Sequence, residues 1–231
     1  MRRALGILSV TLITAGLVVL ADVATTLAWK EPVSTVYGSI QQGQAEDELA
    51  DLETRFPARA DLRKVARIPE IRKKVDVLAG LFANRVRTGE AIGRIEIPSI
   101  DVDVVVVQGT DTASLQKGPG HYPETPFPGQ GGTTAIAGHR TTYLAPFRHL
   151  DALKPGDEVL LNMPYANFAY RVQKTRVVDD SAVDIIHDTG YERLVLTACH
   201  PLYSAAQRIA AFAKLEEVSF FALEGRPWTD P

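Results

Sequence analysis

Hydrophobic and polar residues change their spacing twice along the chain, which divides it into three kinds of predicted structure. The first kind is an almost wholly apolar run over residues 4–20, which follows Arg2 and Arg3. A helix needs roughly 20 apolar residues to cross a bilayer, and this run reaches that length only by continuing past Asp22. Residues 1–29 are therefore predicted to form an N-terminal membrane helix. Its arginines would stay inside the cell, which places the rest of the chain outside.

The end of this helix also has features of a membrane boundary. Trp29 and Lys30 suit the outer interface, where an amphipathic ring and a long-stemmed amine are both stable. The alternative is a cleaved signal peptide, for which Thr-Leu-Ala at residues 26–28 is a poor small-residue site. In either case the remaining chain is exported. If the helix is retained, the protein is a single-pass protein of the cell membrane.

Residues 30–90 have the spacing of helices. One narrow apolar stripe recurs at intervals of three and four and consists of Leu49, Leu52 and Phe56. Pro57 and Pro69 interrupt the pattern, so two or three short helices are expected. A second stripe, expected to pack on the following domain, consists of Val75, Leu78, Leu81 and Phe82. A role as a spacer or docking segment is favoured over catalysis.

From Ala91 onward the pattern is that of β-strands. Gly and Pro mark the turns, as at residues 117–120 and 154–157. The predicted strands are rich in Val and Ile and cover residues 92–97, 102–107, 133–137, 158–161, 168–178, 194–196 and 208–218. Seven or eight short strands with long loops, and no regular alternation with helices, favour a single all-β barrel or sandwich over residues 91–231.

Composition and charge exclude several function classes. The chain has 25 basic and 28 acidic residues, a net charge of -3, which argues against nucleic acid as a partner. The sequence shows no internal repeat, no Gly-rich phosphate loop and no cluster of cysteines and histidines at metal-ligand spacing. Neither a metal nor another cofactor is expected.

Cys199 is the only cysteine, so in an exported chain it has no intramolecular disulfide partner. An unpaired cysteine there indicates intermolecular pairing or a reactive thiol. The thiolate is the nucleophile, and histidine is its usual partner. His200 is adjacent on the same strand and would point to the opposite face. His139 is the better candidate, because it follows an apolar strand and Gly138 at the start of a loop. His121 is interpreted as a surface or rim residue.

Arg208 is the candidate for stabilising negative charge. It opens an apolar strand that is expected to neighbour the strand ending at Cys199. A guanidinium is permanently charged and offers a planar fork of donors, which suits an oxyanion or a substrate carbonyl. The alternative is an ordinary arginine at a strand edge.

These positions, in their local strings, carry a resemblance to a known family. Ala-Gly-His-Arg at residues 137–140, Leu-Val-Leu-Thr-Ala-Cys at residues 194–199, and Arg208 nine residues later resemble the sortases. Sortases are membrane-anchored cysteine transpeptidases of Gram-positive bacteria, built on a closed eight-stranded β-barrel. The resemblance covers about residues 91–223. The string Gly-Pro-Gly-His-Tyr-Pro at residues 118–123 is most similar to class E, the housekeeping type common in actinobacteria.

The resemblance implies a role for each residue. Cys199 would attack the Thr–Gly bond of a C-terminal sorting signal and form a thioacyl enzyme, with His139 moving protons and Arg208 holding the oxyanion. The implied partners are secreted proteins that carry the signal and a cell-wall precursor amine of the lipid II type. Class E enzymes favour Leu-Ala-x-Thr-Gly over Leu-Pro-x-Thr-Gly, and Tyr122 occupies the position associated with that preference.

One string departs from the family pattern Thr-Leu-x-Thr-Cys. Here it reads Val-Leu-Thr-Ala-Cys over residues 195–199, so Ala198 removes a hydroxyl beside the nucleophile. We expect an altered rate or signal preference rather than loss of chemistry. The expected substrate-binding residues are Tyr122, Thr197, Ala198 and His200.

Three alternatives remain open from the sequence. A pilin-polymerising sortase often carries an Asp-Pro-aromatic lid and a second, C-terminal membrane helix, and neither is expected here. A non-catalytic, anchored β-barrel would bind its ligand equally well after Cys199→Ala. An L,D-transpeptidase would use a string such as Ser-His-Gly-Cys, which the sequence lacks.

Overall fold

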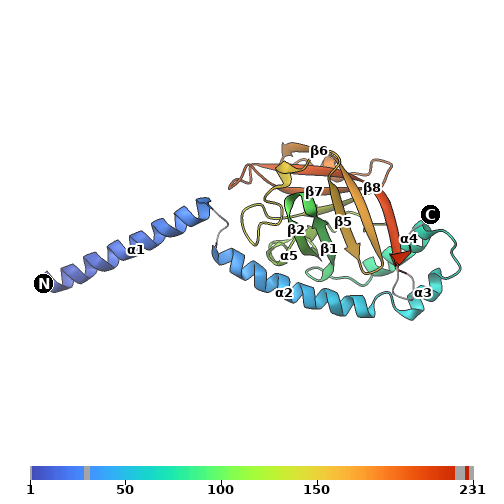
Figure 1. Cartoon of the computed structure of the whole chain (residues 1–231), viewed down its shortest axis with the longest axis horizontal. Helices are drawn as coiled ribbons and strands as arrows, with labels where there is room; N and C mark the ends of the chain where they lie inside the picture. Colours follow the sequence, from blue (N-terminus) through green and yellow to red (C-terminus); the bar gives the residue numbers. More distant parts are fainter. Residues whose placement is uncertain (1, 29–31, 222–226, 229–231) are drawn as a thin grey trace.

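The structure is a computed structural model that describes residues 2–28, 32–221 and 227–228. Helix α1 (Arg2–Ala28) projects away from the rest of the molecule (Figure 1). Its segment Arg3–Ala24 is long and apolar enough to cross a membrane, and these side chains are exposed. Trp29 and Lys30, the predicted interface pair, lie outside the described residues, as does part of the end of the 91–231 region.

Three helices follow: α2 (Pro32–Arg55), α3 (Arg59–Val65) and α4 (Ile71–Ala83). The prediction of short helices is confirmed for α3 and α4 but is wrong for α2, which is one helix of 24 residues. A proline is tolerated in the first turn of a helix, where its missing N–H has no partner to lose, so Pro32 can open α2. As predicted, Pro57 and Pro69 lie between helices.

These helices pack on the barrel. Leu49 of α2 is buried against the first two strands, and Phe56 joins the main core. The second predicted stripe is confirmed in the same way: Val75, Leu78 and Phe82 of α4 are buried in the main core, and Leu81 packs partly buried against it. Figure 1 shows α2 running along the barrel with α4 beyond it.

Eight strands form the closed barrel that was predicted. They are β1 (Ala91–Ile97), β2 (Val102–Gln108), β3 (Gly120–His121), β4 (Thr133–Ala137), β5 (Glu158–Met163), β6 (Ala166–Asp179), β7 (Arg193–His200) and β8 (Gln207–Phe221). Their order is β6-β5-β1-β2-β3-β4-β7-β8, and pairing of β6 with β8 closes it. The pairs β2–β3 and β4–β7 are parallel. A short strand, β9 (Pro227–Trp228), pairs with the end of β8.

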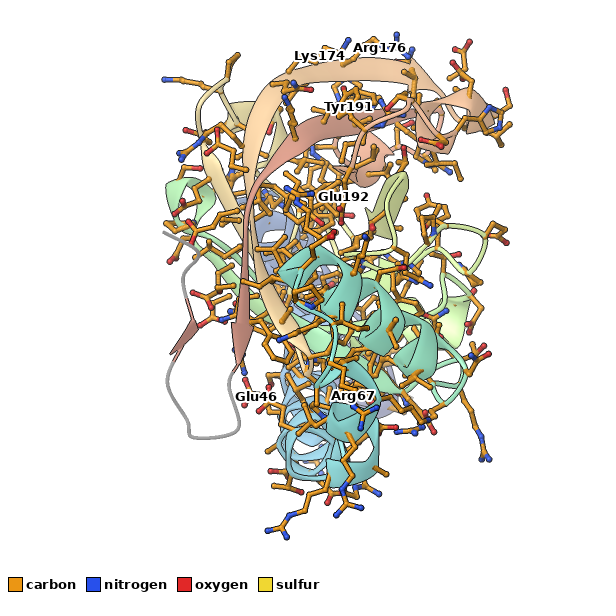
Figure 2. All side chains as sticks on the ribbon, turned by 90° about the vertical axis from the view of Figure 1, so that its right-hand side faces the viewer. Glu46, Arg67, Lys174, Arg176, Tyr191 and Glu192 are labelled. Atoms are coloured by element: carbon orange, nitrogen blue, oxygen red, sulfur yellow. The ribbon has the colours of Figure 1, made fainter. Side chains whose placement is uncertain are left out.

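Strands β6 and β8 correspond to the strands predicted over residues 168–178 and 208–218 and extend each of them by one to three residues at either end. β6 has 14 residues and β8 has 15, and they pair along most of their length. Figure 2 shows the two strands arching together over the barrel, with Lys174 and Arg176 on the outer side of β6. The connections contain the short helices η1 (Pro98–Ile100), α5 (Thr112–Lys117), η2 (Leu150–Ala152) and η3 (Val183–Ile186).

Side chains of β7 divide between two apolar clusters. Leu194, Leu196 and Ala198 belong to the main core inside the barrel, whereas Val195 belongs to a smaller cluster on the outer face. Successive side chains of a strand point to opposite faces, so this division fixes the direction of every residue in β7. The outer cluster, which also contains Ile185 of η3, marks the face where the candidate site lies.

Candidate active site

Strand pairing brings the candidate nucleophile and the candidate oxyanion-binding residue together. Cys199 lies directly opposite Arg208 in the antiparallel pair of β7 and β8. Side chains of directly opposed residues start from Cβ atoms about 5 Å apart on one face. Val195 lies four residues before Cys199 in β7, and Ala210 lies two residues after Arg208 in β8, so each points to the same face as its partner. Both belong to the outer cluster, and Cys199 and Arg208 therefore face outward.

The candidate histidine lies at the same level on the other side of β7. Ala137 of β4 is the parallel partner of Thr197, and the N–H of Gly138 donates to the carbonyl of Thr197 over 2.9 Å. Cys199 lies two residues past Thr197 in β7, and His139 lies two residues past Ala137, just beyond the end of β4. The pairing of β7 with β8 therefore places Cys199 and Arg208 in one row, and the chain that leaves β4 brings His139 to the level of that row.

Gly138 has a packing reason to be glycine. A Cβ added there would overlap the ring of Phe147, which is fully buried in the main core. The position therefore faces the barrel interior, and the next residue, His139, faces outward. The loop that follows returns to this point, since the N–H of Phe147 donates to the carbonyl of His139 over 3.0 Å.

His139 is half-buried, and this burial lowers its pKa from the ordinary value of 6.5. Its ring lies against Tyr143, with ring centroids 5.1 Å apart. A lowered pKa leaves the imidazole neutral at neutral pH, in the form that accepts a proton. Among the described residues, no hydrogen bond joins the Cys199 Sγ to the His139 ring.

Arg208 is held by backbone carbonyls rather than by an acid. Its Nη1 donates to the carbonyls of Ala205 and Gln207 over 2.8 and 2.9 Å. Within the described part of the chain no carboxylate forms an ion pair with it. The remaining N–H groups and the full positive charge stay available beside Cys199, as an oxyanion-binding group requires.

Tyr122 and Thr197 are also brought together on the outer face. The Tyr122 hydroxyl lies 3.0 Å from the Thr197 hydroxyl, two residues before Cys199 in β7. Tyr122 then lines a cavity of about 860 Å³ whose other wall includes Val183 and Ile186 of η3. This cavity offers a space between the segment that follows Tyr122, the start of β4 at Thr133, and η3.

Two other predicted substrate-binding residues do not lie on this face. Ala198 is 3% exposed and packs inside the barrel, so its methyl group faces away from Cys199. The expectation that it replaces a hydroxyl at the substrate is corrected by this direction. His200 has a structural partner, because its Nδ1 lies 2.9 Å from the Nη1 of Arg140.

His121 is the second correction. The sequence placed it at the surface or rim, but it is 1% exposed and its ring stacks on Phe127 at 4.5 Å. Its Nδ1 lies 2.9 Å from the Oε1 of Gln108, and burial lowers its pKa to about 4. This histidine is part of the packing beneath the site.

Two residues near the site were missed from the sequence. Arg140 is 3% exposed and forms an ion pair of 2.6 Å with Asp151 of η2 in addition to its contact with His200. Arg140 therefore ties the loop after His139 to the end of β7. The other missed residue is Tyr143, which covers His139. Neither residue was assigned a role from the sequence, although Arg140 belongs to the Ala-Gly-His-Arg string that carries the family resemblance and Tyr143 follows it three residues later.

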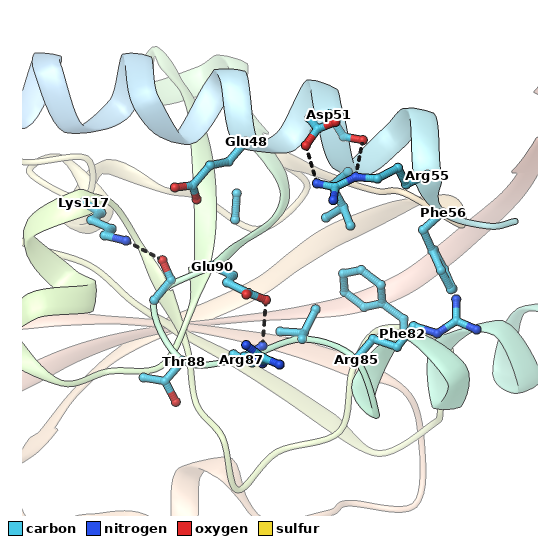
Figure 3. Close-up of a pocket in the computed structure, with 14 residues that line it drawn as sticks. Glu48, Asp51, Arg55, Phe56, Phe82, Arg85, Arg87, Thr88, Glu90 and Lys117 are labelled. Carbon is cyan, nitrogen blue, oxygen red and sulfur yellow. Dashed lines mark hydrogen bonds and ion pairs between the residues drawn. The ribbon is translucent and has the colours of Figure 1, made fainter.

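One hollow lies at Cys199, and a larger cavity lies away from the candidate site. Cys199 lines a hollow of about 360 Å³ together with Arg140, Thr141, and Pro201 and residues 203–205 of the β7–β8 loop. A cavity of about 610 Å³ lies instead between α2 and the start of β1 (Figure 3). Its charged side chains bind nearby groups, as in the 2.7 Å bond from Lys117 Nζ to the carbonyl of Gly89. None of the candidate catalytic residues lines it.

Comparisons with known proteins point to one family. A sequence model of the Sortase domain matches residues 95–216. Sortase D of Bacillus subtilis is 39% identical over 117 residues, which are 49% of this chain and 57% of that protein. Sortase SrtE1 of Streptomyces coelicolor is 28% identical over 145 residues, covering 56% of this chain and 41% of that protein. The chain thus spans about two fifths to three fifths of these relatives.

Solved structures agree in fold. The structure of sortase E from Streptomyces avermitilis has a TM-score of 0.53 at 32% identity, covering 61% of this chain and 93% of that one. Sortase E1 from Streptomyces coelicolor, solved with a tripeptide in the active site, has a TM-score of 0.55 at 27% identity, covering 60% and 91%. The similarity thus includes the class E enzymes whose strings the sequence resembles.

Proposed function

This chain belongs to the sortase family, and from that premise we propose that it is a cysteine transpeptidase. Its substrate would be a secreted protein ending in a signal like Leu-Ala-x-Thr-Gly or Leu-Pro-x-Thr-Gly. The enzyme would cleave between Thr and Gly and join the new carboxyl end to an amine of a cell-wall precursor. The observation that carries this proposal is the row formed by His139, Cys199 and Arg208 on one outer face.

In the first half of the reaction the Cys199 thiol gives its proton to His139, and its sulfur attacks the carbonyl carbon of the threonine. The Thr–Gly bond breaks as the thioester bond forms. His139 returns the proton to the departing glycine amine. The lowered pKa of His139 keeps the ring in its neutral, accepting form and makes the protonated ring a stronger acid toward the departing amine.

The second half runs in the opposite direction. The precursor amine attacks the thioester carbonyl and gives a proton to His139, while the sulfur leaves and is protonated. Splitting one difficult acyl transfer into two easier steps is what covalent catalysis achieves. Arg208 stabilises the oxyanion in both halves, because its cross-strand position opposite Cys199 is fixed.

The outer-face cavity is the proposed binding surface for the signal. Tyr122 lines this cavity and is linked to β7 through the Thr197 hydroxyl, two residues before Cys199, and the cavity extends from Tyr122 to Val183 of η3. A related sortase E1 was solved with a tripeptide in its active site, which supports a peptide ligand here. Tyr122 is then the proposed specificity residue.

Helix α1 is the proposed single-pass membrane anchor, with the catalytic region outside the cytoplasm. The apolar span Arg3–Ala24 and its exposed side chains support this placement. The proposed division is an anchor over residues 1–29, a helical region over 30–90 and the catalytic barrel over 91–231.

The test is a peptide transfer assay on the full chain in detergent. The chain is incubated with Leu-Ala-x-Thr-Gly and Leu-Pro-x-Thr-Gly peptides, with and without a glycine or diaminopimelate amine, and products are resolved by mass spectrometry. We expect cleavage after threonine, an amine-linked product, and loss of both after Cys199→Ala or His139→Ala. His149→Ala, at an exposed position, is the matched control. Peptide binding without cleavage would support the binding module instead.

A further inference from the structure

The first two turns of α2 have their polar and apolar sides reversed. The residues that face the barrel there are small or polar: Ser34, Gly38 and Gln42. The residues that face outward form an apolar stripe at helical spacing, with exposed fractions of 73% for Val33, 62% for Val36, 44% for Tyr37 and 55% for Ile40. A helix packed on a water-soluble barrel normally has the opposite arrangement.

Contacts with the barrel prevent α2 from rotating to bury this stripe. The N–H of Tyr143 donates to the Ser34 hydroxyl over 3.2 Å. A Cβ on Gly38 would lie only 3.0 Å from the carbonyl carbon of Tyr143, so the two backbones are in close approach. The Gln42 side-chain amide both accepts from the N–H of Val105, over 2.8 Å, and donates to the carbonyl of Lys117, over 2.6 Å.

The outward face changes character along the helix. Beyond Ile40 half of the exposed residues of α2 are acidic, namely Glu46, Asp47, Glu48, Asp51 and Glu53. The apolar stripe is therefore confined to the end of α2 that is nearer to α1. Val33 follows the last residue of the apolar span, Ala24, by only nine positions. The stripe is therefore close in sequence to the end of the proposed membrane helix.

We propose that residues 33–40 of α2 lie in the outer interface of the membrane, with this stripe among the lipid headgroups and upper acyl chains. The proposal rests on the proposed membrane anchorage of α1. Apolar and aromatic side chains on one face are typical of interfacial helices, and tyrosine is enriched at that depth. The acidic half of α2 would then leave the surface, since anionic lipids repel it.

This placement brings the candidate site to the membrane surface. The Tyr37 ring lies edge-on to Tyr143 with centroids 6.1 Å apart, and Tyr143 lies against His139 at 5.1 Å. Only the Tyr143 ring therefore lies between the stripe, to which Tyr37 belongs, and the His139 ring. A sorting signal and a lipid-linked amine, both held in the bilayer, would reach the site without the enzyme leaving the surface.

The single native cysteine makes the test direct. In a Cys199→Ala background, one cysteine is introduced at a time and spin-labelled: Val36→Cys or Ile40→Cys on the stripe, and Asp47→Cys on the acidic half. Val18→Cys of α1 is the control for anchorage. The full chain is placed in nanodiscs of phosphatidylethanolamine and phosphatidylglycerol at one chain per disc. Collisions with oxygen, which concentrates in lipid, are compared with those of a water-soluble nickel chelate.

If the proposal is correct, labels at positions 36 and 40 favour oxygen over the nickel chelate, whereas the label at 47 favours the chelate. Equal chelate access at 36, 40 and 47, with the label at 18 still protected, overturns the interfacial helix but leaves α1 as an anchor. Chelate access at 18 as well refutes both. Protection of 36 and 40 only when discs hold two chains would show that a second copy covers the stripe, which also overturns the proposal.

Discussion

The inner and outer faces of β4, β7 and β8 carry different kinds of residue, although the two kinds alternate along the same strands. Inward positions are apolar and closely packed, as for Leu196 and Ala198 of β7. Outward positions at the ends of the strands carry the thiol of Cys199 and the guanidinium of Arg208. The same alternation separates His121, buried under the site, from Tyr122, which follows it in the chain and lines the outer cavity.

This difference shows why a rigid barrel suits the proposed chemistry. Fixed register on the outer face sets the positions of reacting groups, and the packed inner face prevents that register from shifting. Changes on the outer face are therefore expected to affect rates, whereas changes on the inner face affect stability first. The following experiments test that separation, beginning with the largest expected effect.

Arg208→Lys tests the outer face. A lysine keeps the charge but loses the planar fork, so the transfer rate is expected to fall about 10²–10³-fold, the effect of removing one oxyanion donor. The free energy of unfolding should remain nearly unchanged. The measurement is kcat for peptide cleavage together with urea unfolding. Arg176→Lys, on the outer side of β6, is the matched control, and an equal rate loss there would show that the site is not specific to Arg208.

His121 tests the inner face through pH. Its pKa in the folded protein is about 4, and its ordinary value is 6.5. As the pH falls, the unfolded chain therefore binds the extra proton at a higher pH than the folded protein does. Stability from this residue is complete above pH 6.5 and is lost as the pH falls toward 4. At 1.36 kcal/mol per unit, the loss is about 3 kcal/mol.

The corresponding measurement is urea unfolding of the wild type and of His121→Gln across this pH range. Glutamine retains polar atoms but does not titrate, so the variant should show a flatter dependence between pH 6.5 and 4. His149→Gln, at an exposed position, should behave as the wild type. A variant whose profile is as steep as that of the wild type would assign the acid sensitivity to other groups.

Gly138→Ala tests the boundary between the two faces. The added methyl group overlaps the ring of Phe147, and overpacking of this kind costs about 1–3 kcal/mol. Gly43→Ala is the control, because it lies in α2 with nothing within 4 Å of the new Cβ. That variant should gain about 0.5–1 kcal/mol. Thermal unfolding of both proteins measures the difference, and an equal response would refute the packing role of Gly138.

Tyr143→Ala tests the cover over His139. Burial is the cause of the lowered pKa of His139, so removing the ring that lies against it should raise that pKa toward 6.5. A proton NMR titration of the His139 ring gives the pKa directly, and the acid limb of the rate profile should move the same way. Tyr143→Phe keeps the cover and should restore the wild-type pKa. An unchanged pKa in the alanine variant contradicts this role.

Much of the fold was predictable because local patterns decide it. Strand β4 begins and ends at the residues predicted, since its apolar run lies between glycine-rich segments. The length of α2 was not predictable, because Ser34, Gly38 and Gln42 face the barrel and leave no apolar stripe toward the core. β6 and β8 were predicted to within one to three residues at each end, and the remaining residues belong to these strands because the two strands pair with each other.

In the candidate site, too, some residues could be identified from the sequence and others could not. Cys199, His139 and Arg208 were proposed because their local strings resemble a family, and in the structure Cys199 lies opposite Arg208 while His139 follows the end of the neighbouring strand β4. The directions of Ala198 and His121 depend on the phase of each strand in the closed barrel, so the sequence interpretation of both was wrong. Long-range contacts, such as that of Arg140 with His200, appear only in three dimensions.

The central claim is that the outer row forms an acyl-transfer site with sulfur as the nucleophile. The most direct measurement is intact-protein mass spectrometry of the chain mixed with a Leu-Ala-x-Thr-Gly peptide, without an acceptor amine and quenched in acid. We expect a mass increase equal to that of the peptide acid ending in threonine less one water, located on Cys199 and removed by hydroxylamine. Amine-linked product formed without any acylation of Cys199 would contradict it.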